Sequence, residues 1–579
     1  MLPFIHGVAE TYIDNERDLL PQCCFVFPNK RSATFFHHAY ARACNEKGLQ
    51  LIHPATVTIS DFILEMAHTV EPDRMEKIFL LYDAYCEIIR ENVRRDIKPE
   101  KLKSLLDFNH FLRWADMILG DFNDVDMYCV DPESIFPNVK RYKEISTNYV
   151  SADVMAEIQK HWKTSAGRYS TLDDRFWNHI GQGDGDAAQT ADFFRMWQIM
   201  LPLYRRFNEK LDSKGMSYNG KAYLRAIGYI DSTAAEDLPY RRYVFMGFNM
   251  VSDAEEKVFA LLRDKQAPVP LADFYFDDAS PVFNSRFIPG HGAAIAIKSL
   301  KKKFPSLYQG AVRPIGEFPK IEIIGIPSRV GQMKIAGEIV RSLYPRQLCE
   351  DALADASVAE DLKEQLRRTA IVLPQESMVK GVMSALPGWL PAVNFTMGYR
   401  LRDSSVASLV RDIVSMHHRS HISKAGVRTF FCEDVRKVLS HPLMLQYFQN
   451  ESQAIDRMLS IKHLFNVRPS DIVDLYPDLE PVFTFVGVNA SPEDVIAYFY
   501  KLTRWLGRYV DADIEKHRGD VITDIDGSRH EATARVSAAA VVDYLLVHQY
   551  ENSLGRLRQL IDMYGHKGFS LTESTFYQM

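Results

Sequence analysis

Cysteine is scarce in this sequence of 579 residues, and its spacing excludes the common disulfide and metal motifs. The seven cysteines are scattered along the chain, and none has C-x-x-C spacing. The only adjacent pair, Cys23 and Cys24, lies in an apolar run, where neighbouring side chains of a strand point to opposite faces. Buried, reduced thiols of this kind are typical of an intracellular protein.

Long apolar runs and a strong net charge are also missing. No stretch of about 18 apolar residues occurs and the N-terminus has no basic segment, so neither a transmembrane helix nor a signal peptide is expected. The sequence therefore predicts a cytoplasmic protein without a membrane partner. The formal net charge of -6 excludes a polycation, so any contact with nucleic acid must come from local basic patches.

A phosphate-binding loop is missing where a motor protein would need one. The nearest match to G-x-x-x-x-G-K, residues 215–222, ends in Ala222 and lacks the hydroxyl that would hold Mg²⁺. It follows an amphipathic helix and no buried strand, which favours a junction between two helices. The strand expected at 243–248 is followed by Asn249, where an ATPase would place a metal-binding carboxylate. We therefore expect neither ATP hydrolysis nor a bound cofactor.

Strand and helix signals alternate at the start of the chain and return near residue 240. Buried strands are expected at 23–28, 55–59, 243–248 and 273–277, and this β-α-β rhythm predicts a parallel sheet. Between them, a stretch with helical spacing and almost no strand signal predicts a helical insertion.

A second α/β unit is expected after a proline-rich linker. Its strands are predicted at 321–326 and 369–373, with a helix at 332–343 between them. The fold class predicted is α/β, with two parallel-sheet domains that each carry a helical insertion. The predicted domains are a first α/β domain (1–62 and 238–285), a helical insertion (63–237), a linker (286–318), a second, incomplete α/β domain (319–402) and a helical domain (403–579).

Three residues at the tip of the first strand form the best-placed candidate site. Asn29, Lys30 and Arg31 directly follow this strand and open the next helix. Ligands of open α/β sheets bind at the carboxyl tips of the strands, and a helix N-terminus favours anions. The arrangement predicts contact with a phosphate or a nucleic-acid backbone. Plain helix capping and salt bridging is the alternative.

A second basic group lies just before the linker prolines. Lys301 and Lys302, together with Lys298 and Lys303, can contact a phosphate backbone. Most charge runs are only solvated faces, which is the alternative here.

Two further patterns suggest catalysis only weakly. Residues 255–257 form the E-x-K triplet of metal-dependent nucleases, but Ser252 and Glu255 place the triplet in the first turn of a capped helix, where acidic residues are favoured anyway. His417 and His421 have the i, i+4 spacing of zinc ligands, but no third ligand is indicated, which favours a solvated helix end.

Several segments together resemble one family of DNA-processing proteins. The most specific is Asn-Phe-Thr-Met-Gly-Tyr-Arg-Leu at 394–401. The others are 26–31, 246–249 with Glu255, 274–277, 328–332, 370–374 with Glu376, and 440–442. The chain is similar in these segments to the AddB-like branch of the RecB-type helicase–nuclease proteins, in the form common in Bacteroidetes. The similarity extends over residues 1 to about 450.

The resemblance implies a superfamily 1 helicase-like fold with domains 1A, 1B, 2A and 2B, and a role in processing double-strand DNA breaks for recombination. It implies that Asn29, Lys30 and Arg31 contact single-stranded DNA. It also implies that Thr396, Met397 and Gly398 lie near the path of the strand. The partners that it implies are DNA and an active helicase–nuclease subunit of AddA type.

The function predicted is that of a catalytically inert, helicase-like DNA-binding portion of a recombination nuclease. Relatives continue with a PD-(D/E)XK nuclease domain, and because no such motif precedes Met579, the chain resembles an N-terminal portion. One alternative is a structural subunit that scaffolds an active helicase. The other is a nuclease or ATPase with an unrecognised site.

Overall fold

The structure of the chain is a computed structural model. The fold is mixed α/β and mostly helical, with one four-stranded, all-parallel sheet. The chain divides into two units, Met1–Lys320 and Ile321–Glu573, which are described in turn. The structure describes residues 3–50, 52–92, 100, 102, 106–136, 186–267, 269–284, 292–312, 320–354, 356–390, 393–394, 401–422, 427–484, 492–518, 522–523, 529–530 and 538–564.

Four short, buried strands form the sheet of the first unit, as the alternating pattern predicts. Its order is β2-β1-β3-β6, and every neighbouring pair is parallel. Val26 of β1 lies opposite Val57 on one side and Phe245 on the other. The strands are β1 (Cys23–Phe27), β2 (Ala55–Thr58), β3 (Arg242–Met246) and β6 (Ala272–Tyr275).

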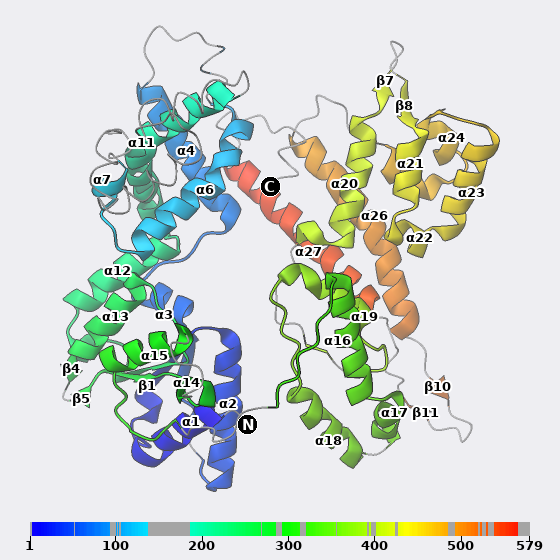
Figure 1. The fold of residues 1–579 in the computed structure, drawn as a ribbon. Coiled ribbons are helices and arrows are strands. Elements are labelled where there is room, and N and C mark those ends of the chain that lie inside the picture. Colours follow the sequence, from blue (N-terminus) through cyan, green and yellow to red (C-terminus); the bar gives the residue numbers. More distant parts are fainter. Residues whose placement is uncertain are drawn as a thin grey trace, which may run out of the picture. The chain divides into compact units, whose positions relative to one another are not determined.

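Helices cover both faces of this sheet (Figure 1). Because side chains alternate along a strand, Phe25 and Phe27 pack on one side, against α1 and α2, while Cys24 and Val26 pack on the other. That other side is covered by α3, α12, α13 and α15. Apart from α12, which belongs to the helical insertion, the helices are α1 (Pro3–Asn15), α2 (Lys30–Glu46), α3 (Ile59–Met66), α13 (Asp253–Asp264) and α15 (Gly292–Lys303).

A set of helices is inserted between α3 and β3, and no strand occurs among the described residues between β2 and β3. Within this set α11 packs on α4, and α12 packs on α6, α3 and α13, so α12 joins the insertion to the sheet. Aspartates cap two of its helices, Asp107 at α6 and Asp131 at α7. The helices are α4 (Arg74–Asn92), α6 (Phe108–Met127), α7 (Pro132–Ile135), α11 (Asp186–Ser213) and α12 (Asn219–Ser232). The first unit also holds β4 (Gln266–Ala267), β5 (Val269–Pro270) and α14 (Pro281–Asn284).

The second unit is mainly helical. Its helices are α16 (Arg329–Leu343), α17 (Arg346–Ala354), α18 (Ala356–Arg367), α19 (Val379–Ala385), α20 (Ser405–His418), α21 (Cys432–Leu439), α22 (Pro442–Tyr447), α23 (Gln449–Ile461), α24 (Pro469–Val473), α25 (Glu480–Phe483), α26 (Pro492–Arg518) and α27 (Ala538–Tyr564). Its strands are β7 (His421–Ile422), β8 (Arg428–Phe431), β9 (Asn466–Val467), β10 (Ile522–Thr523) and β11 (Arg529–His530). The strand pairs among its described residues are all antiparallel, and the two long helices α26 and α27 pack against each other.

The second parallel sheet, predicted within residues 319–402, is absent from the described residues. The helix at 329–343 is present, but 321–326 and 369–373 make no strand pairing. Most of their apolar side chains are exposed to solvent, with Ile323 91% exposed and Val372 85% exposed. A strand needs a backbone partner and a covering layer, and the described part of this unit supplies neither for these segments.

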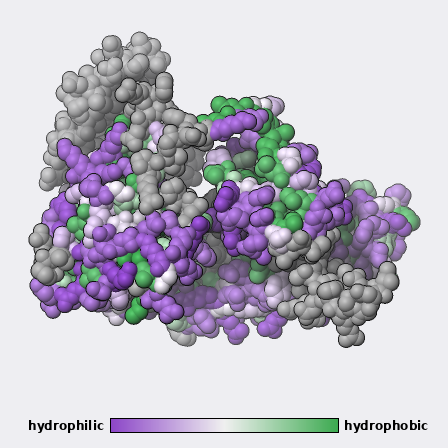
Figure 2. Space-filling model, turned by 90° about the horizontal axis from the view of Figure 1, so that it is seen from below, coloured by the Kyte–Doolittle hydropathy of each residue, from purple (hydrophilic) through white to green (hydrophobic). Residues whose placement is uncertain are grey.

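Hydrophilic side chains dominate the face seen in Figure 2, with hydrophobic areas between them. None of the described helices combines the length and apolar character needed to cross a bilayer.

Candidate nucleic-acid interface

The carboxyl ends of the four parallel strands share one edge of the sheet. The chain leaves β1 to form β2 on one side and then returns to form β3 on the other side of β1. The ends of β1 and β3 therefore flank the point where the strand order reverses, which is the usual ligand position in open α/β sheets. The segments at this point are 28–31, after β1, and 247–252, after β3.

Asn29 occupies the N-cap of α2. Its extended backbone, with φ -155° and ψ 161°, lets its side-chain oxygen accept hydrogen bonds from the backbone N–H of Ser32 at 3.0 Å and from the Ser32 hydroxyl at 3.2 Å. Asn29 therefore caps α2 through its amide oxygen, and its contact with DNA stays a prediction.

Lys30 and Arg31, the next two residues, are exposed at the same helix end. Neither makes an ion pair with any carboxylate of the described chain, and the first turn of α2 contains no acidic residue. Cations are disfavoured here, because the helix dipole already places positive charge at the N-terminus. The two side chains thus form an uncompensated positive group at the reversal point of the sheet.

The other side of this point is a tight turn after β3. Gly247 has φ +78°, and its N–H donates to the carbonyl of Tyr275 at 3.0 Å. Helix α13 then starts with a capping box, as predicted, in which Ser252 and Glu255 exchange hydrogen bonds. Glu255 also accepts a hydrogen bond from the Tyr223 hydroxyl at 3.2 Å. Its carboxylate is thus engaged in capping α13 and in this contact, which gives no support to a nuclease role for the E-x-K triplet.

Carboxylates neutralise part of the second basic group, near the end of β6. Lys301 donates to Asp278 at 2.5 Å, and Lys303 donates to Glu256 at 2.7 Å. Lys302 is exposed and has no ion-pair partner in the described part of the chain. Of the two predicted contacts, Lys302 alone remains a free cation. The third predicted group, Thr396, Met397 and Gly398, lies outside the described residues.

Residues 215–222 join two helices, as their sequence context predicts. They link the end of α11 to the start of α12, and Gly215 takes the left-handed turn conformation with φ +66°. Lys221 is buried, donates from Nζ to the carbonyl of Asn208 at 2.8 Å and pairs with Asp212 at 2.7 Å. Burial lowers the pKa of Lys221, and its ammonium is engaged in packing α12 on α11.

His417 and His421 do not share a helical face. His417 lies in the last turn of α20 and is buried, with its Nε2 2.8 Å from the carbonyl oxygen of Val482 and its Nδ1 3.1 Å from the guanidinium of Arg428. His421 is exposed on β7. The zinc interpretation therefore fails, and the solvated helix end preferred in its place is wrong for His417, because elements far along the chain bury its ring.

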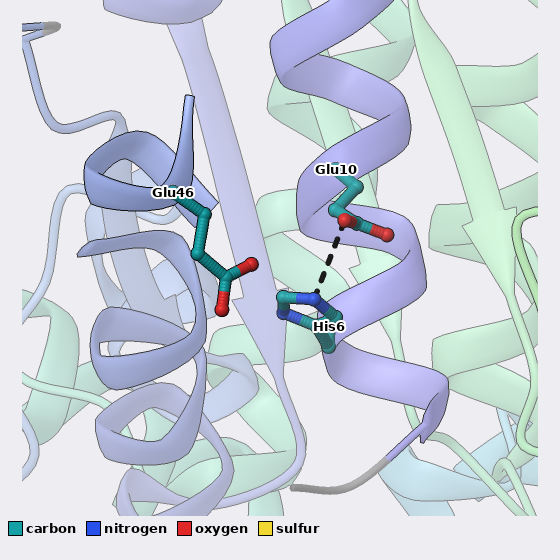
Figure 3. A group of neighbouring side chains, drawn as sticks. All are labelled: His6, Glu10 and Glu46. Atoms are coloured by element: carbon teal, nitrogen blue, oxygen red, sulfur yellow. Dashed lines mark ion pairs between the residues drawn. The ribbon is translucent and has the colours of Figure 1, made fainter. Parts of the chain in front are cut away.

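One group of side chains that could bind a metal ion was not predicted from the sequence: His6, Glu10 and Glu46 (Figure 3). His6 and Glu10 lie one turn apart on α1, 3.4 Å from Nε2 to Oε1, and Glu46 reaches them from the end of α2. One ligand atom from each lies within 4.8 Å of the others, which is close enough for a divalent cation. However, Arg42 donates to Glu46 at 2.6 Å and holds the pKa of that carboxyl below its usual value. The site thus already has a cationic partner.

The i, i+4 spacing of His6 and Glu10 was the available signal for this group, but nothing local indicates that Glu46 joins them. A comparison with models of known protein families finds no match, and neither does a comparison with curated proteins.

Proposed function

We propose that this chain is a non-catalytic, helicase-like DNA-binding portion of a recombination nuclease of the AddB-like, RecB-type branch. It grips the DNA backbone at the carboxyl edge of the first sheet, without ATP hydrolysis or a cofactor. The observation that carries the proposal is the pair of free, exposed cations Lys30 and Arg31 in the first turn of α2. The proposal includes a superfamily 1 arrangement, a cytoplasmic location and an active partner subunit of AddA type.

A phosphate backbone suits this position for two physical reasons. The first-turn N–H groups and the dipole of α2 favour an anion, and Lys30 and Arg31 add two mobile positive charges beside them. No carboxylate of the described residues fixes either side chain, so both can follow a flexible strand. Neutralising two phosphates of a single strand contributes a salt-dependent slope of about -1.4 in log K against log salt.

The position of residues 215–222, which are similar to a phosphate-binding loop, supports a proposal without ATP hydrolysis. Lys221 is held between Asn208 and Asp212 at the junction of α11 and α12, in a segment that follows a helix and not a strand. The turn after β3 offers Asn249, which is not a carboxylate. Of the two acidic residues that follow β6, Asp277 accepts from the backbone N–H of Ala279 at 3.2 Å and Asp278 is paired with Lys301.

The test is salt-dependent binding of a labelled single-stranded oligonucleotide, read by fluorescence anisotropy. We expect Lys30→Ala with Arg31→Ala to weaken binding about tenfold or more near 0.1 M salt, and to reduce the salt slope by about 1.4. The matched control is Arg42→Ala with Lys47→Ala, which removes one arginine and one lysine from the other end of α2. Equal affinity and slope in the two double variants would overturn the proposal.

A structural subunit that scaffolds an active helicase is the second candidate. It is favoured by the exposed apolar segments 321–326 and 369–373, which offer surface for a partner. Its signature is stable co-purification with an AddA-type subunit, combined with no binding of single-stranded DNA even at low salt.

A further inference from the structure

A hollow of about 800 Å³ lies in the second unit, between α26, residues 477–481 and α27. One of its lining residues is the buried Trp505, whose Nε1 donates to the backbone carbonyl of Asp478 at 2.6 Å. Tyr500 lies on its wall and packs against α27 where Gly555 leaves room, since a Cβ there would lie 2.9 Å from the tyrosine oxygen. The size is within the range of about 300 to 1,000 Å³ that ligand sites occupy.

Positive side chains converge on this hollow from two helices. Lys501, Arg504 and Arg508 are spaced i, i+3 and i+7 on α26 and so line one face of it, and Arg558 comes from α27. Two carboxylates, Asp478 and Glu480, also line the hollow, which leaves four cations against two anions.

Three of these four cations have no carboxylate partner. Lys501 is paired with Glu480 at 2.6 Å, whereas Arg504, Arg508 and Arg558 are exposed and make no ion pair within the described part of the chain. Arg504 instead lies over the ring of Tyr500, 5.8 Å from its centroid. This ring contact attracts the guanidinium without neutralising its charge.

Two other arginines of the same unit are compensated by carboxylates. Arg346 pairs with Glu350 on its own helix at 2.7 Å, and Arg436 pairs with Asp456 at 2.8 Å. Like charges that face each other on one helix destabilise it by a few tenths of a kcal/mol per pair. Arg504 and Arg508, one turn apart on α26, repel each other in this way, and an anion bound between them would remove the repulsion.

We propose that Arg504, Arg508 and Arg558 form a second phosphate-binding site, which holds the backbone of a nucleic-acid strand. The planar guanidinium donates two parallel hydrogen bonds to phosphate oxygens, which makes arginine the preferred residue for this ligand. The hollow is open and larger than one phosphate group, so it accommodates consecutive nucleotides of a strand. That the site binds phosphate is argued from its arginines alone. Only the choice of nucleic acid as the source of the phosphate rests on the proposed function.

The first test compares the variant Arg504→Gln, Arg508→Gln, Arg558→Gln with the control Arg457→Gln, an exposed α23 arginine outside the hollow. We expect the triple variant to bind a 20-nucleotide single strand at least tenfold more weakly near 0.1 M salt, with a salt slope lower by about 2. The control should bind as the wild type does. Unchanged affinity and slope in the triple variant would overturn the proposal.

Inorganic tripolyphosphate, titrated by calorimetry, distinguishes the two sources of phosphate. We expect it to bind the wild type more weakly than the oligonucleotide does. Tripolyphosphate binding that is as tight as DNA binding, and that the triple variant loses, would identify a free polyphosphate site and overturn the nucleic-acid assignment.

A second measurement uses the wild-type chain and so does not depend on the folding of a variant. Phenylglyoxal modifies accessible arginines, and mass spectrometry reports each site. We expect the oligonucleotide to protect Arg504, Arg508 and Arg558 and to leave Arg457 reactive, whereas equal protection at all four positions would contradict the site.

The double variant Lys30→Ala, Arg31→Ala, measured in parallel, keeps this inference separate from the proposed function. If the Lys30, Arg31 variant binds DNA normally while the triple arginine variant does not, the proposed DNA contact at the first sheet is wrong and the site in the hollow is supported. If the triple arginine variant binds DNA normally while the Lys30, Arg31 variant does not, only the proposed site in the hollow is overturned.

Discussion

The hydroxyl of Tyr12 donates a hydrogen bond of 2.5 Å to Oδ2 of Asp273, which connects α1 to the edge strand β6. Both residues are fully buried. The other carboxylate oxygen accepts from the backbone N–H groups of Phe274 and Leu307, at 2.9 and 2.8 Å. Burial raises the pKa of the Asp273 carboxyl and of the Tyr12 phenol. Removing one partner therefore leaves the other in a place that water does not reach.

Tyr12→Phe should lower the free energy of unfolding by about 1 to 3 kcal/mol, because Oδ2 of Asp273 loses its hydrogen bond inside the core. Urea unfolding monitored by circular dichroism measures this loss. The control is Tyr128→Phe, at an exposed tyrosine, where a change within about 0.5 kcal/mol is expected. Similar losses in the two variants would show that the hydrogen bond adds nothing beyond a surface hydroxyl.

Two glycines of α12 should respond in opposite directions to alanine. A Cβ at Gly220 would lie 2.6 Å from the carbonyl oxygen of Asn123 and 2.8 Å from Cβ of Asp126, whereas a Cβ at Gly228 would meet nothing within 4 Å. Gly220→Ala should destabilise the chain by about 1 to 3 kcal/mol through overpacking. Gly228→Ala should stabilise it by up to about 1 kcal/mol, since alanine favours the helix.

Thermal unfolding of the two variants, with the wild type alongside, measures both changes. The pair also tests the role of the G-x-x-x-x-G-K-like segment. If Gly220 serves the packing of α12 on α6, its substitution alters stability, and loss of nucleotide binding at unchanged stability would contradict that role.

The parts of the fold that follow local chemistry could be predicted from the sequence. Buried β1 is an unbroken apolar run, and the residues after it carry their own cap in Asn29. The capping box of Ser252 and Glu255 is likewise encoded within four residues. Such signals do not depend on distant contacts, so the first sheet and the starts of its helices could be predicted from the sequence.

The features that could not be predicted from the sequence depend on contacts between residues far apart in the chain. Ile323 lies in an apolar run that suits a strand, but strand formation needs a neighbour to pair with, and the described part of the second unit places none beside it. His417 and Val482 are 65 positions apart, so no local pattern indicates that the ring is buried. Glu46 approaches His6 only because two helices pack together.

The exposure of Ile323 leads to a prediction that opposes the sheet interpretation. Ile323→Thr should change the free energy of unfolding by less than about 0.5 kcal/mol, because the side chain is in solvent already. Val340→Thr, in the small core between α16 and its neighbours, should cost about 1 to 3 kcal/mol by burying a hydroxyl. Urea unfolding of both variants measures the contrast. A large loss at Ile323 would indicate that 321–326 is buried in a sheet.

His417 should make stability depend on pH, because its ring satisfies its neighbours only when neutral. Nε2–H then donates to the carbonyl of Val482, and Nδ1 accepts from Arg428. Burial, with the positive charge of Arg428 and the neighbouring His418, lowers the pKa of His417 to about 4. The unfolded chain, with an ordinary pKa of about 6.5, thus binds the proton more readily than the folded chain does between these two values.

The folded state should consequently lose stability as the pH falls from about 6.5 to about 4, by about 3 kcal/mol in total, and this contribution should be constant above and below that window. His417→Gln keeps a donor for Val482 but cannot titrate, so its free energy of unfolding should fall less over the window. Urea unfolding at pH 4, 5, 6 and 7 measures the difference between variant and wild type. His421→Gln, at an exposed histidine, should retain the wild-type pH dependence, and the same retention in His417→Gln would show that the buried ring does not cause it.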